Sequence, residues 1–517
     1  MELVKKNIHM EHQINWASTQ ISLEEDQNIS DQKPDAFKII SKKADVRTEE
    51  IKPVEEAVWV KGTMEYSILY LTDEKEKRLC CMEGKLAFEE KVYTEKNVSG
   101  DGLRVHLKME DLTIRLINSR KLNIRAIIGL ELKQDELYDE EIVVDVENSR
   151  KCEILKKPLD VTAIALDTKD IYRIREEIQI PDGFPNIYNL LWKDVRVESL
   201  TFTPIEGRVS VSGEVNAFFL YEGEEEEMTP RCFEINRSFS GTLEMPECRE
   251  GMPLWVDYEL EKTAVEVKPD YDGEEREIDI DIELRLFIKL YNNYVVSCVA
   301  DAYGIQEKMV PVMKNTELMK MIKRECGKIK VNGFWENTED PGNALQVLHA
   351  DGVLVEERTE VKEDEICLDG VVHVELLCVS AADTTPYRCV VMDIPYEHAI
   401  TVDRVMPGNP CYGKLCIDQI NAVIQGDRIE ARVILSFQLC VYDNRKEFLL
   451  TEMRKDETEI EDRMFPVMSV YFARDNESIW EVGKKYQVSL DSIRTINELS
   501  GDELQEGQQL LIVKEMI

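Results

Sequence analysis

Hydrophobic and polar side chains alternate along most of the chain, and three stretches with this alternation share one pattern. They read VWVKGTMEYSILYL, VSVSGEVNAFFLYE and ICLDGVVHVELLCV, at residues 58–71, 209–222 and 366–379, and they align without gaps. Apolar residues stand at even distances from a central glycine, as the buried face of a β-strand requires. The glycines, Gly62, Gly213 and Gly370, recur at intervals of roughly 150 residues. One structural unit has therefore been used three times.

A second alternating strand is predicted in each unit, about 60 residues after the glycine, beginning at Leu122, Ile278 and Ile429. The glycine itself lies in the middle of an apolar strand face, where it weakens the strand unless a bulge, a bend or a close approach requires the missing side chain. Its recurrence at one register predicts the same crowded position in all three units.

A short helix is predicted upstream of each glycine. The segments AFKIISKKADV, IYNLLWKDVRV and ALQVLHADGVL carry apolar residues three positions apart, at the spacing of one helical face. The first of each pair is Phe37, Tyr188 or Leu345, and the second is Ile40, Leu191 or Leu348. Each unit is thus expected to be a mainly β domain, sandwich-like or barrel-like, with a short helix.

The last 45 or so residues have a different pattern. Short apolar strands are predicted at 470–472 and 510–513, and two helices between them can be capped by Ser478 and Ser489. This order, strand, helix, helix and strand, predicts a small α+β module.

A chain of 517 residues is too long for one hydrophobic core and divides into domains. The expected domains are residues 1–180, 181–335 and 336–462 for the three repeated units, each mainly β, and 466–517 for the terminal module. A charged segment that ends at Pro466 is expected to link the last two.

The net charge of −39 makes nucleic acid and anionic lipid unfavourable partners. The acidic run from Glu224 to Glu227 is expected to be a solvated hairpin loop rather than a cation site. The N-terminal residues lack the apolar core of a secretory signal, and no apolar run reaches the roughly 20 residues needed to cross a bilayer. Together with 13 cysteines and no Cys-x-x-Cys pair, these features predict a cytosolic protein with reduced thiols.

Few residues suggest catalysis or metal binding. No phosphate loop, dinucleotide fingerprint, zinc-protease or nucleophile-elbow motif occurs in the chain, so we expect no enzyme activity, no catalytic residue and no cofactor. The third unit concentrates several possible zinc ligands, but Cys378 lies on an apolar strand face, and no metal site is expected. His373 is expected to be a hydrogen-bonded surface residue. The possible ligands considered are Cys367, His373, Cys378, Cys389, Cys411, Cys416 and Cys440.

The terminal module closely resembles the LysM domain. The resemblance rests on Ile479 and Trp480 at the start of the first helix, on KKYQVSLDSI between the helices, and on LQEGQQLLI before the last strand. In LysM domains that bind N-acetylglucosamine polymers, the groove lies between two loops that correspond here to residues 475–478 and 497–502. The usual Gly-Asp-Thr before the first helix is replaced by Asn476, Glu477 and Ser478.

Three β units followed by a LysM domain resemble the SipL family of clostridial sporulation proteins, which carry SPOCS repeats. The resemblance implies a non-enzymatic scaffold of the endospore coat, in the mother-cell cytoplasm at the outer forespore surface. It also implies that the LysM domain docks on the stage IV sporulation protein A ATPase, with other coat or forespore-surface proteins as possible partners. The alternative is a protein that binds peptidoglycan of the cortex or cell wall.

The residues expected to contact a partner are exposed positions of the two loops and the first helix. Trp480 has a second interpretation of equal weight, because a tryptophan in so small a module can simply cover its core. The expected contact residues are Asp475, Asn476, Glu477, Ser478, Trp480, Lys484, Lys485, Asn497 and Asp502.

Overall fold

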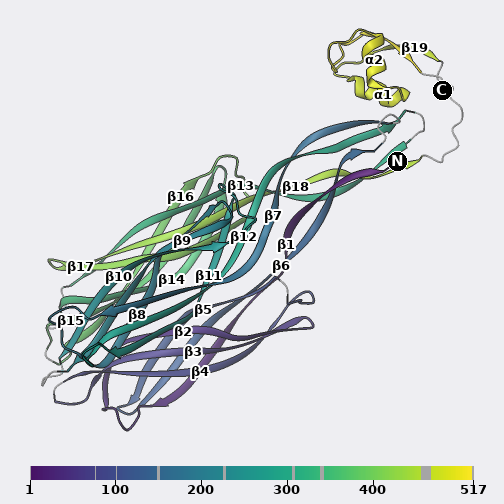
Figure 1. The fold of residues 1–517 in the computed structure, drawn as a ribbon. Helices are drawn as coiled ribbons and strands as arrows, with labels where there is room; N and C mark the ends of the chain where they lie inside the picture. The colour runs from purple at the N-terminus through teal and green to yellow at the C-terminus, as the bar shows by residue number, and fades with distance from the viewer. Residues whose placement is uncertain are drawn as a thin grey trace.

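The protein is a long body of antiparallel strands that narrows into a neck, with a small helical module at the end of the neck (Figure 1). It is seen here in a computed structural model. The residues that the structure describes are 2–75, 77–100, 102–147, 152–224, 229–305, 309–337, 343–382, 384–455 and 467–514. The acidic run at 224–227 and the linker before Pro466 lie largely outside them.

Eighteen strands form three units of six strands each, and every unit is a pair of three-stranded antiparallel sheets. The sheets of the first unit have the orders β1-β6-β5 and β2-β3-β4, and the other two units repeat this topology. The first unit contains β1 (Leu3–Asn28), β2 (Ala36–Val54), β3 (Ala57–Thr72), β4 (Leu79–Tyr93), β5 (Leu103–Asn118) and β6 (Lys121–Val146). The second contains β7 (Cys152–Gln179), β8 (Ile187–Ile205), β9 (Arg208–Gly223), β10 (Pro230–Glu244), β11 (Leu254–Pro269) and β12 (Glu275–Gly304). The third contains β13 (Met309–Glu336), β14 (Ala344–Lys362), β15 (Glu365–Ser380), β16 (Tyr387–Thr401), β17 (Cys411–Gln425) and β18 (Arg428–Lys455).

The mainly β expectation and both repeated strands are confirmed. The predicted apolar faces of β3, β9 and β15 are buried, and so are those of β6, β12 and β18. Residues from both sheets of a unit fill one core, and the three cores are separate. Each unit is therefore a β-sandwich.

The repeated glycine makes room for an aromatic ring on the neighbouring strand. Gly62 pairs with Phe88, and Gly213 and Gly370 pair in the same register with Phe239 and Tyr396. A Cβ atom at Gly213 would lie 2.8 Å from Cζ of Phe239, closer than packed carbon atoms approach. The predicted crowding is therefore present at Gly62 and Gly213, where an aromatic ring packs over the glycine.

The three predicted helices are wrong, because these segments are the first parts of strands β2, β8 and β14. Each contains two β-bulges three residues apart, and a bulge adds one residue that interrupts the alternation of sides. The bulged residues are the apolar residues, three positions apart, from which the helices were predicted. Their environments differ, because Tyr188 is 62% exposed whereas Leu191 is 3% exposed. Among the described residues, helices occur only in the terminal module.

Strand pairing places the unit boundaries earlier than the expected residues 180 and 335. Strand β7 pairs along its length with β12, and β13 pairs with β18. Each of these strands would be cut off from its own sheet by the expected boundaries. The pairing favours boundaries in the connections 147–151 and 305–308.

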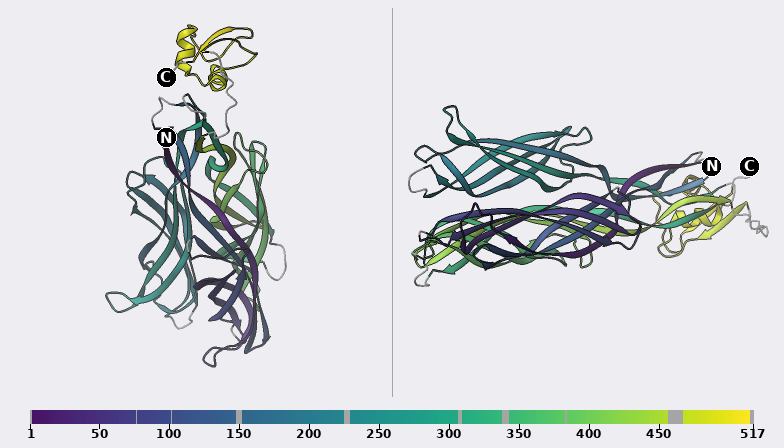
Figure 2. Two further views of the ribbon diagram at one scale, coloured as in Figure 1. Left: turned by 90° about the vertical axis from the view of Figure 1, so that its right-hand side faces the viewer. Right: turned by 90° about the horizontal axis from the view of Figure 1, so that it is seen from below.

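The three units pack around a common axis (Figure 2). Their longest strands extend past the sandwiches as paired ribbons and form the neck, whose small apolar core draws residues from all three units. A second shared apolar cluster lies within the body. It includes Ile40, Leu191 and Leu348, the second bulge of each unit, so the bulges bring an extra apolar side chain to the axis.

A buried polar network also joins the three units. Asp194 of the second unit pairs with Lys43 of the first, and it accepts a hydrogen bond from His349 of the third at 3.1 Å. Arg196 binds the Asp194 carboxylate at 2.5 Å and the carbonyl of Ala350 at 2.7 Å. Burial by itself would raise the pKa of Asp194, but Lys43, Arg196 and His349 hold that pKa well below its usual value. The network therefore favours one arrangement of the units.

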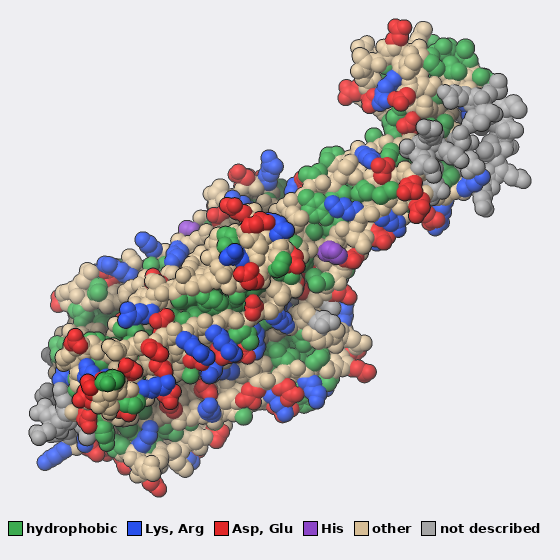
Figure 3. Space-filling model, viewed as in Figure 1, with side chains coloured by type: hydrophobic (Ala, Val, Ile, Leu, Met, Phe, Trp, Pro, Cys, Tyr) green, Lys and Arg blue, Asp and Glu red, His purple; other side chains and the backbone are tan. Residues whose placement is uncertain are grey.

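Surface charges of both signs are interspersed over the face of the body seen in Figure 3. All 13 cysteines are unpaired, and among them Cys378 and Cys440 are buried and Cys326 is exposed. Within the described residues, no helix is long and apolar enough to span a bilayer.

Candidate docking site on the C-terminal module

The terminal module consists of β19 (Met468–Phe472), α1 (Ile479–Tyr486), α2 (Leu490–Ile496) and β20 (Gln509–Val513). The expected order of elements is confirmed. Ser478 caps α1 in a capping box with Glu481, and Ser489 caps α2 by accepting a hydrogen bond from the N–H of Ser492 at 3.1 Å. The module has its own apolar core, which is separate from those of the three units.

Helix α1 lies against the tip of the second unit's ribbon, at the end of β12. The indole N–H of Trp480 donates to Asp301 Oδ2 at 3.0 Å, and Lys484 Nζ lies 2.6 Å from the same oxygen. The Trp480 ring packs edge-on against Tyr303, with 5.0 Å between ring centroids. Trp480 is 8% exposed in this position. It therefore packs against the neck rather than in the module's own apolar core.

The second helix is held at the same place. The hydroxyl of Tyr303 donates to the carbonyl of Val488 at 2.8 Å, between the helices. The backbone N–H of Leu490, the first residue of α2, donates to Glu153 Oε1 of β7 at 3.0 Å. Burial raises the pKa of Glu153, and this hydrogen bond to the N–H of Leu490 opposes the shift. A carboxylate at a helix N-terminus also interacts favourably with the helix dipole.

Three of the expected contact residues stabilise the module itself. Asn497 donates to the carbonyls of Ile493 and Leu511, both at 2.9 Å, and accepts from the N–H of Leu511 at 2.6 Å, which joins α2 to β20. Glu477 accepts from the Tyr471 hydroxyl at 2.8 Å. Together with the cap Ser478, these residues have structural partners within the module.

The remaining four expected contact residues lie on the surface of the module. Asp475 and Asn476 are exposed in the turn before α1, and Asn476 has a left-handed φ of 57°. Asp502 is exposed and pairs with Arg494 at 2.8 Å. Lys485 is exposed, and its ammonium group lies 4.5 Å from the centre of the Tyr471 ring. These residues are accessible to a partner without movement of the module.

The two loops that correspond to the groove do lie side by side. The N–H of Ile479 donates to the carbonyl of Asp502 at 2.9 Å, and the N–H of Leu504 donates to the carbonyl of Glu477 at 3.1 Å. Some backbone N–H and C=O groups of the two loops are therefore already hydrogen-bonded to each other.

The third unit's possible metal ligands are dispersed. His373 Nδ1 donates to the Asp393 carboxylate at 2.7 Å on the strand surface, as expected. Burial raises the pKa of the Cys378 thiol to about 12. Among the described residues, no three His, Cys, Asp or Glu side chains are grouped to hold a metal ion.

Comparison with known families agrees with this architecture. The family model described as SipL, SPOCS domain, matches residues 35–117 and 186–268, and the LysM domain model matches residues 474–513. The chain contains two SPOCS domains and a C-terminal LysM domain. No curated protein and no solved structure matches it.

The first SPOCS match spans β2 to β5 and the second spans β8 to β11. The third unit lies outside both matches, yet it has the same strand order and bulges at equivalent positions. SPOCS and LysM domains fit a sporulation protein with a LysM module, and both are non-catalytic families.

The residues of the second unit that contact the LysM domain were not found by sequence analysis. Asp301, Tyr303 and Glu153 lie in ordinary strand sequence, and only the pairing of β7 with β12 brings them together at the tip. Nothing in their spacing marks them, because the LysM domain reaches them through a fold that joins residues more than 170 positions apart.

Proposed function

We propose that this chain is a non-enzymatic scaffold of endospore coat assembly. In this proposal its LysM domain docks on the stage IV sporulation protein A ATPase, in the mother cell at the outer surface of the forespore. The three β units form a rigid body that presents the LysM domain at the end of its neck and offers surfaces to other coat proteins.

The observation that carries the proposal is the contact between the LysM domain and Asp301. The helix face with Trp480 and Lys484 binds a protein carboxylate beside an aromatic ring, and so it has the chemistry of a protein-binding surface. Tryptophan and charged side chains of this kind dominate many protein interfaces. The partner is therefore expected to present an acidic group close to an apolar or aromatic one.

Docking and the contact with the neck use the same helix face, so the two compete in this proposal. The Lys484 pair is partly solvated, with its side chain 42% exposed, and an ion pair of that kind contributes about 1 kcal/mol or less. A partner with a larger interface can displace it.

Binding to peptidoglycan is the second candidate, because the two groove loops lie together with Asp475 and Asn476 exposed beside them. Replacement of the family's Gly-Asp-Thr by Asn476, Glu477 and Ser478 speaks against it, as does the pairing of the backbone between these loops.

The test is a pull-down of purified ATPase by full-length protein carrying Lys485→Glu. Lys485 is exposed at the edge of the proposed face, and its ring contacts among the described residues, with Tyr471 and Tyr486, lie within the module. Docking is therefore expected to weaken at least fivefold while the fold is retained. The matched control is Lys75→Glu, an exposed lysine that follows β3 at the opposite end of the body. Equal binding by both variants would remove this face from the proposal, and co-sedimentation with purified peptidoglycan would then favour the second candidate.

A further inference from the structure

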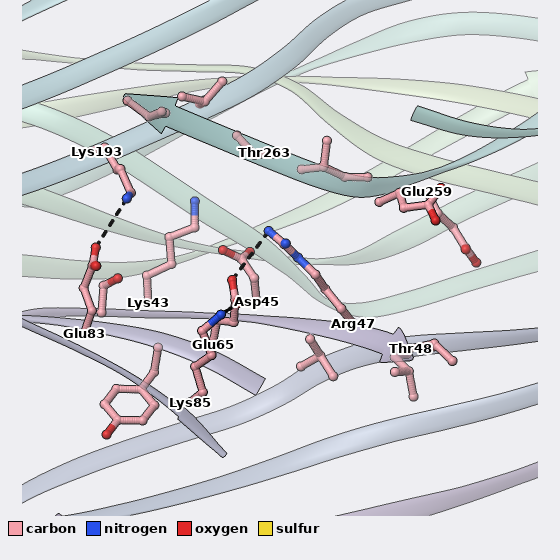
Figure 4. Close-up of a pocket in the computed structure, with 18 of the residues that line it drawn as sticks. Lys43, Asp45, Arg47, Thr48, Glu65, Glu83, Lys85, Lys193, Glu259 and Thr263 are labelled. Atoms are coloured by element: carbon pink, nitrogen blue, oxygen red, sulfur yellow. Dashed lines mark hydrogen bonds and ion pairs between the residues drawn. The ribbon is translucent and has the colours of Figure 1, made fainter. Parts of the chain in front are cut away.

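A cleft lies between the first and second units, far from the LysM domain. It has a volume of about 670 Å³, in the range of ligand cavities. Lys43, Asp45 and Arg47 of β2 stand on one wall, and Glu259 and Thr263 of β11 stand on the other (Figure 4). Both walls carry charged or hydroxyl side chains, which distinguishes the cleft from the apolar cluster shared by the three units.

Two polar atoms of the β11 wall are buried without a donor or acceptor among the described residues. They are Oε2 of Glu261 and Oγ1 of Thr263. The other carboxylate oxygen of Glu261 accepts a hydrogen bond from Arg285. A buried oxygen without a partner costs about 1–3 kcal/mol, and more when it carries charge. These atoms therefore mark a place where a hydrogen-bond donor would be stabilised.

The repeat itself shows what such an oxygen ordinarily binds. Glu261 is the extra residue of a bulge in β11, and bulges at equivalent places put Glu110 in β5 and Asp418 in β17. Asp418 accepts from the backbone N–H of Ser199 across the next seam, at 2.5 Å, and pairs with Lys328 at 2.6 Å. Glu110 accepts from the Gln20 amide at 2.6 Å. At each of the other two bulges, N–H groups from strands outside the bulged hairpin bind the carboxylate. Within the described part of the chain, Glu261 accepts only from Arg285 of its own hairpin.

The charge on the β11 wall favours a cation as the missing donor. Burial is the main cause that raises the pKa of Glu259, and the carboxylates of Asp257 and Glu261 add to it while Arg285 and Lys414 oppose it. The bases of the first unit's wall are already paired, because Lys85 and Arg47 lie 2.5 Å and 3.7 Å from the Glu65 carboxylate, and Lys193 of the second unit lies 3.5 Å from Glu83. A bound cation would relieve the repulsion on the β11 wall.

We propose that the cleft between the first and second units binds an organic cation, an ammonium or guanidinium group that donates to Glu261 and Thr263. Such a group is found on a lysine or arginine side chain of another polypeptide and on a free polyamine. The proposal uses no residue of the LysM domain, so it stands or fails independently of the proposed docking.

The test is calorimetric titration of the full-length protein with three probes. These are agmatine, a terminally blocked Gly-Arg-Gly peptide, and the same peptide with citrulline, which has the shape of arginine without its charge. We expect the citrulline peptide to bind at least tenfold more weakly than the arginine peptide. Tighter binding of the arginine peptide than of agmatine identifies a polypeptide side chain as the ligand, and the reverse order identifies a free amine.

Substitutions locate the binding. Glu261→Gln is expected to reduce affinity for the cation at least tenfold, and Thr263→Val, which removes only a hydroxyl, about threefold. The matched control is Glu110→Gln, the equivalent bulge residue of the first unit, whose carboxylate has a donor and does not line the cleft. The proposal is overturned if neither cationic probe binds at millimolar concentrations, or if Glu110→Gln and Glu261→Gln reduce binding equally.

Discussion

Trp480 and Asp301, which are 179 positions apart in the sequence, are joined by a hydrogen bond of 3.0 Å that fastens the LysM domain to the neck. Asp301 also binds Lys484, so one carboxylate carries two of the polar contacts of this interface. The LysM domain is therefore held against the neck. The exposure of its first helix to a partner depends on Asp301 of the second unit.

The first prediction concerns this carboxylate. Asp301→Ala removes both contacts and is expected to release the LysM domain, which would increase the maximum dimension measured by small-angle X-ray scattering. Because the ATPase competes for the same helix face in our proposal, its affinity is expected to rise severalfold. The control is Asp160→Ala, which breaks a partly exposed ion pair between Asp160 and Lys320, both residues of the neck. An unchanged scattering profile for Asp301→Ala would show that the contact does not hold the domain.

A second prediction concerns the repeated glycine. Gly213→Ala places a methyl group 2.8 Å from the Phe239 ring, and overpacking of this kind costs about 1–3 kcal/mol of unfolding free energy. The combined variant Gly213→Ala and Phe239→Leu is expected to recover part of the loss, because the smaller side chain leaves room. Denaturant unfolding measures both. A simple sum of the two single effects would mean that the ring is not the source of the strain.

A third prediction concerns pH. Burial and the nearby Asp418, Glu234 and Glu214 raise the pKa of Glu198 to about 7, against the opposing effect of Arg196. Since the folded protein holds this proton more tightly than the unfolded chain, the contribution of Glu198 to stability is complete below about pH 4.5 and is lost as the pH rises through 7. Glu198→Gln is therefore expected to gain about 2 kcal/mol relative to the unmodified protein between pH 5.5 and pH 8, measured by denaturant unfolding. A relative stability that does not change with pH would contradict the raised pKa.

A fourth prediction separates structure from docking within the LysM domain. Asn497→Ala removes two hydrogen bonds to Leu511 of β20 and one to the carbonyl of Ile493 in α2, so it is expected to destabilise the domain by about 2 kcal/mol or more. Amide hydrogen exchange should then accelerate in residues 467–514 while the three β units keep their protection. Unchanged exchange in this segment would show that Asn497 is free to serve as a contact residue.

The strands could be predicted from the sequence because alternation reports directly which side chains face a core. The segments at Ile40, Leu191 and Leu348 could not, since two bulges three residues apart produce the spacing of a helix. The presence of this irregularity in all three copies does not distinguish the two structures, because a repeated bulge and a repeated helix look alike in sequence.

The candidate site was predictable only in part. Caps and apolar spacing identified the LysM elements, and Lys485 and Asp502 are exposed as expected. The burial of Trp480 and the pairing of Lys484 with Asp301 were not predictable, because both depend on where the ribbon of β7 and β12 ends. Local sequence carries no information on a contact between two separately folded parts.

The measurement that tests the account most directly is the affinity of the ATPase for the full-length protein and for a chain that ends at residue 465. Both should retain the three β units, because these have cores of their own. We predict that removal of the LysM domain lowers the affinity at least tenfold. Equal affinities would contradict docking through the LysM domain.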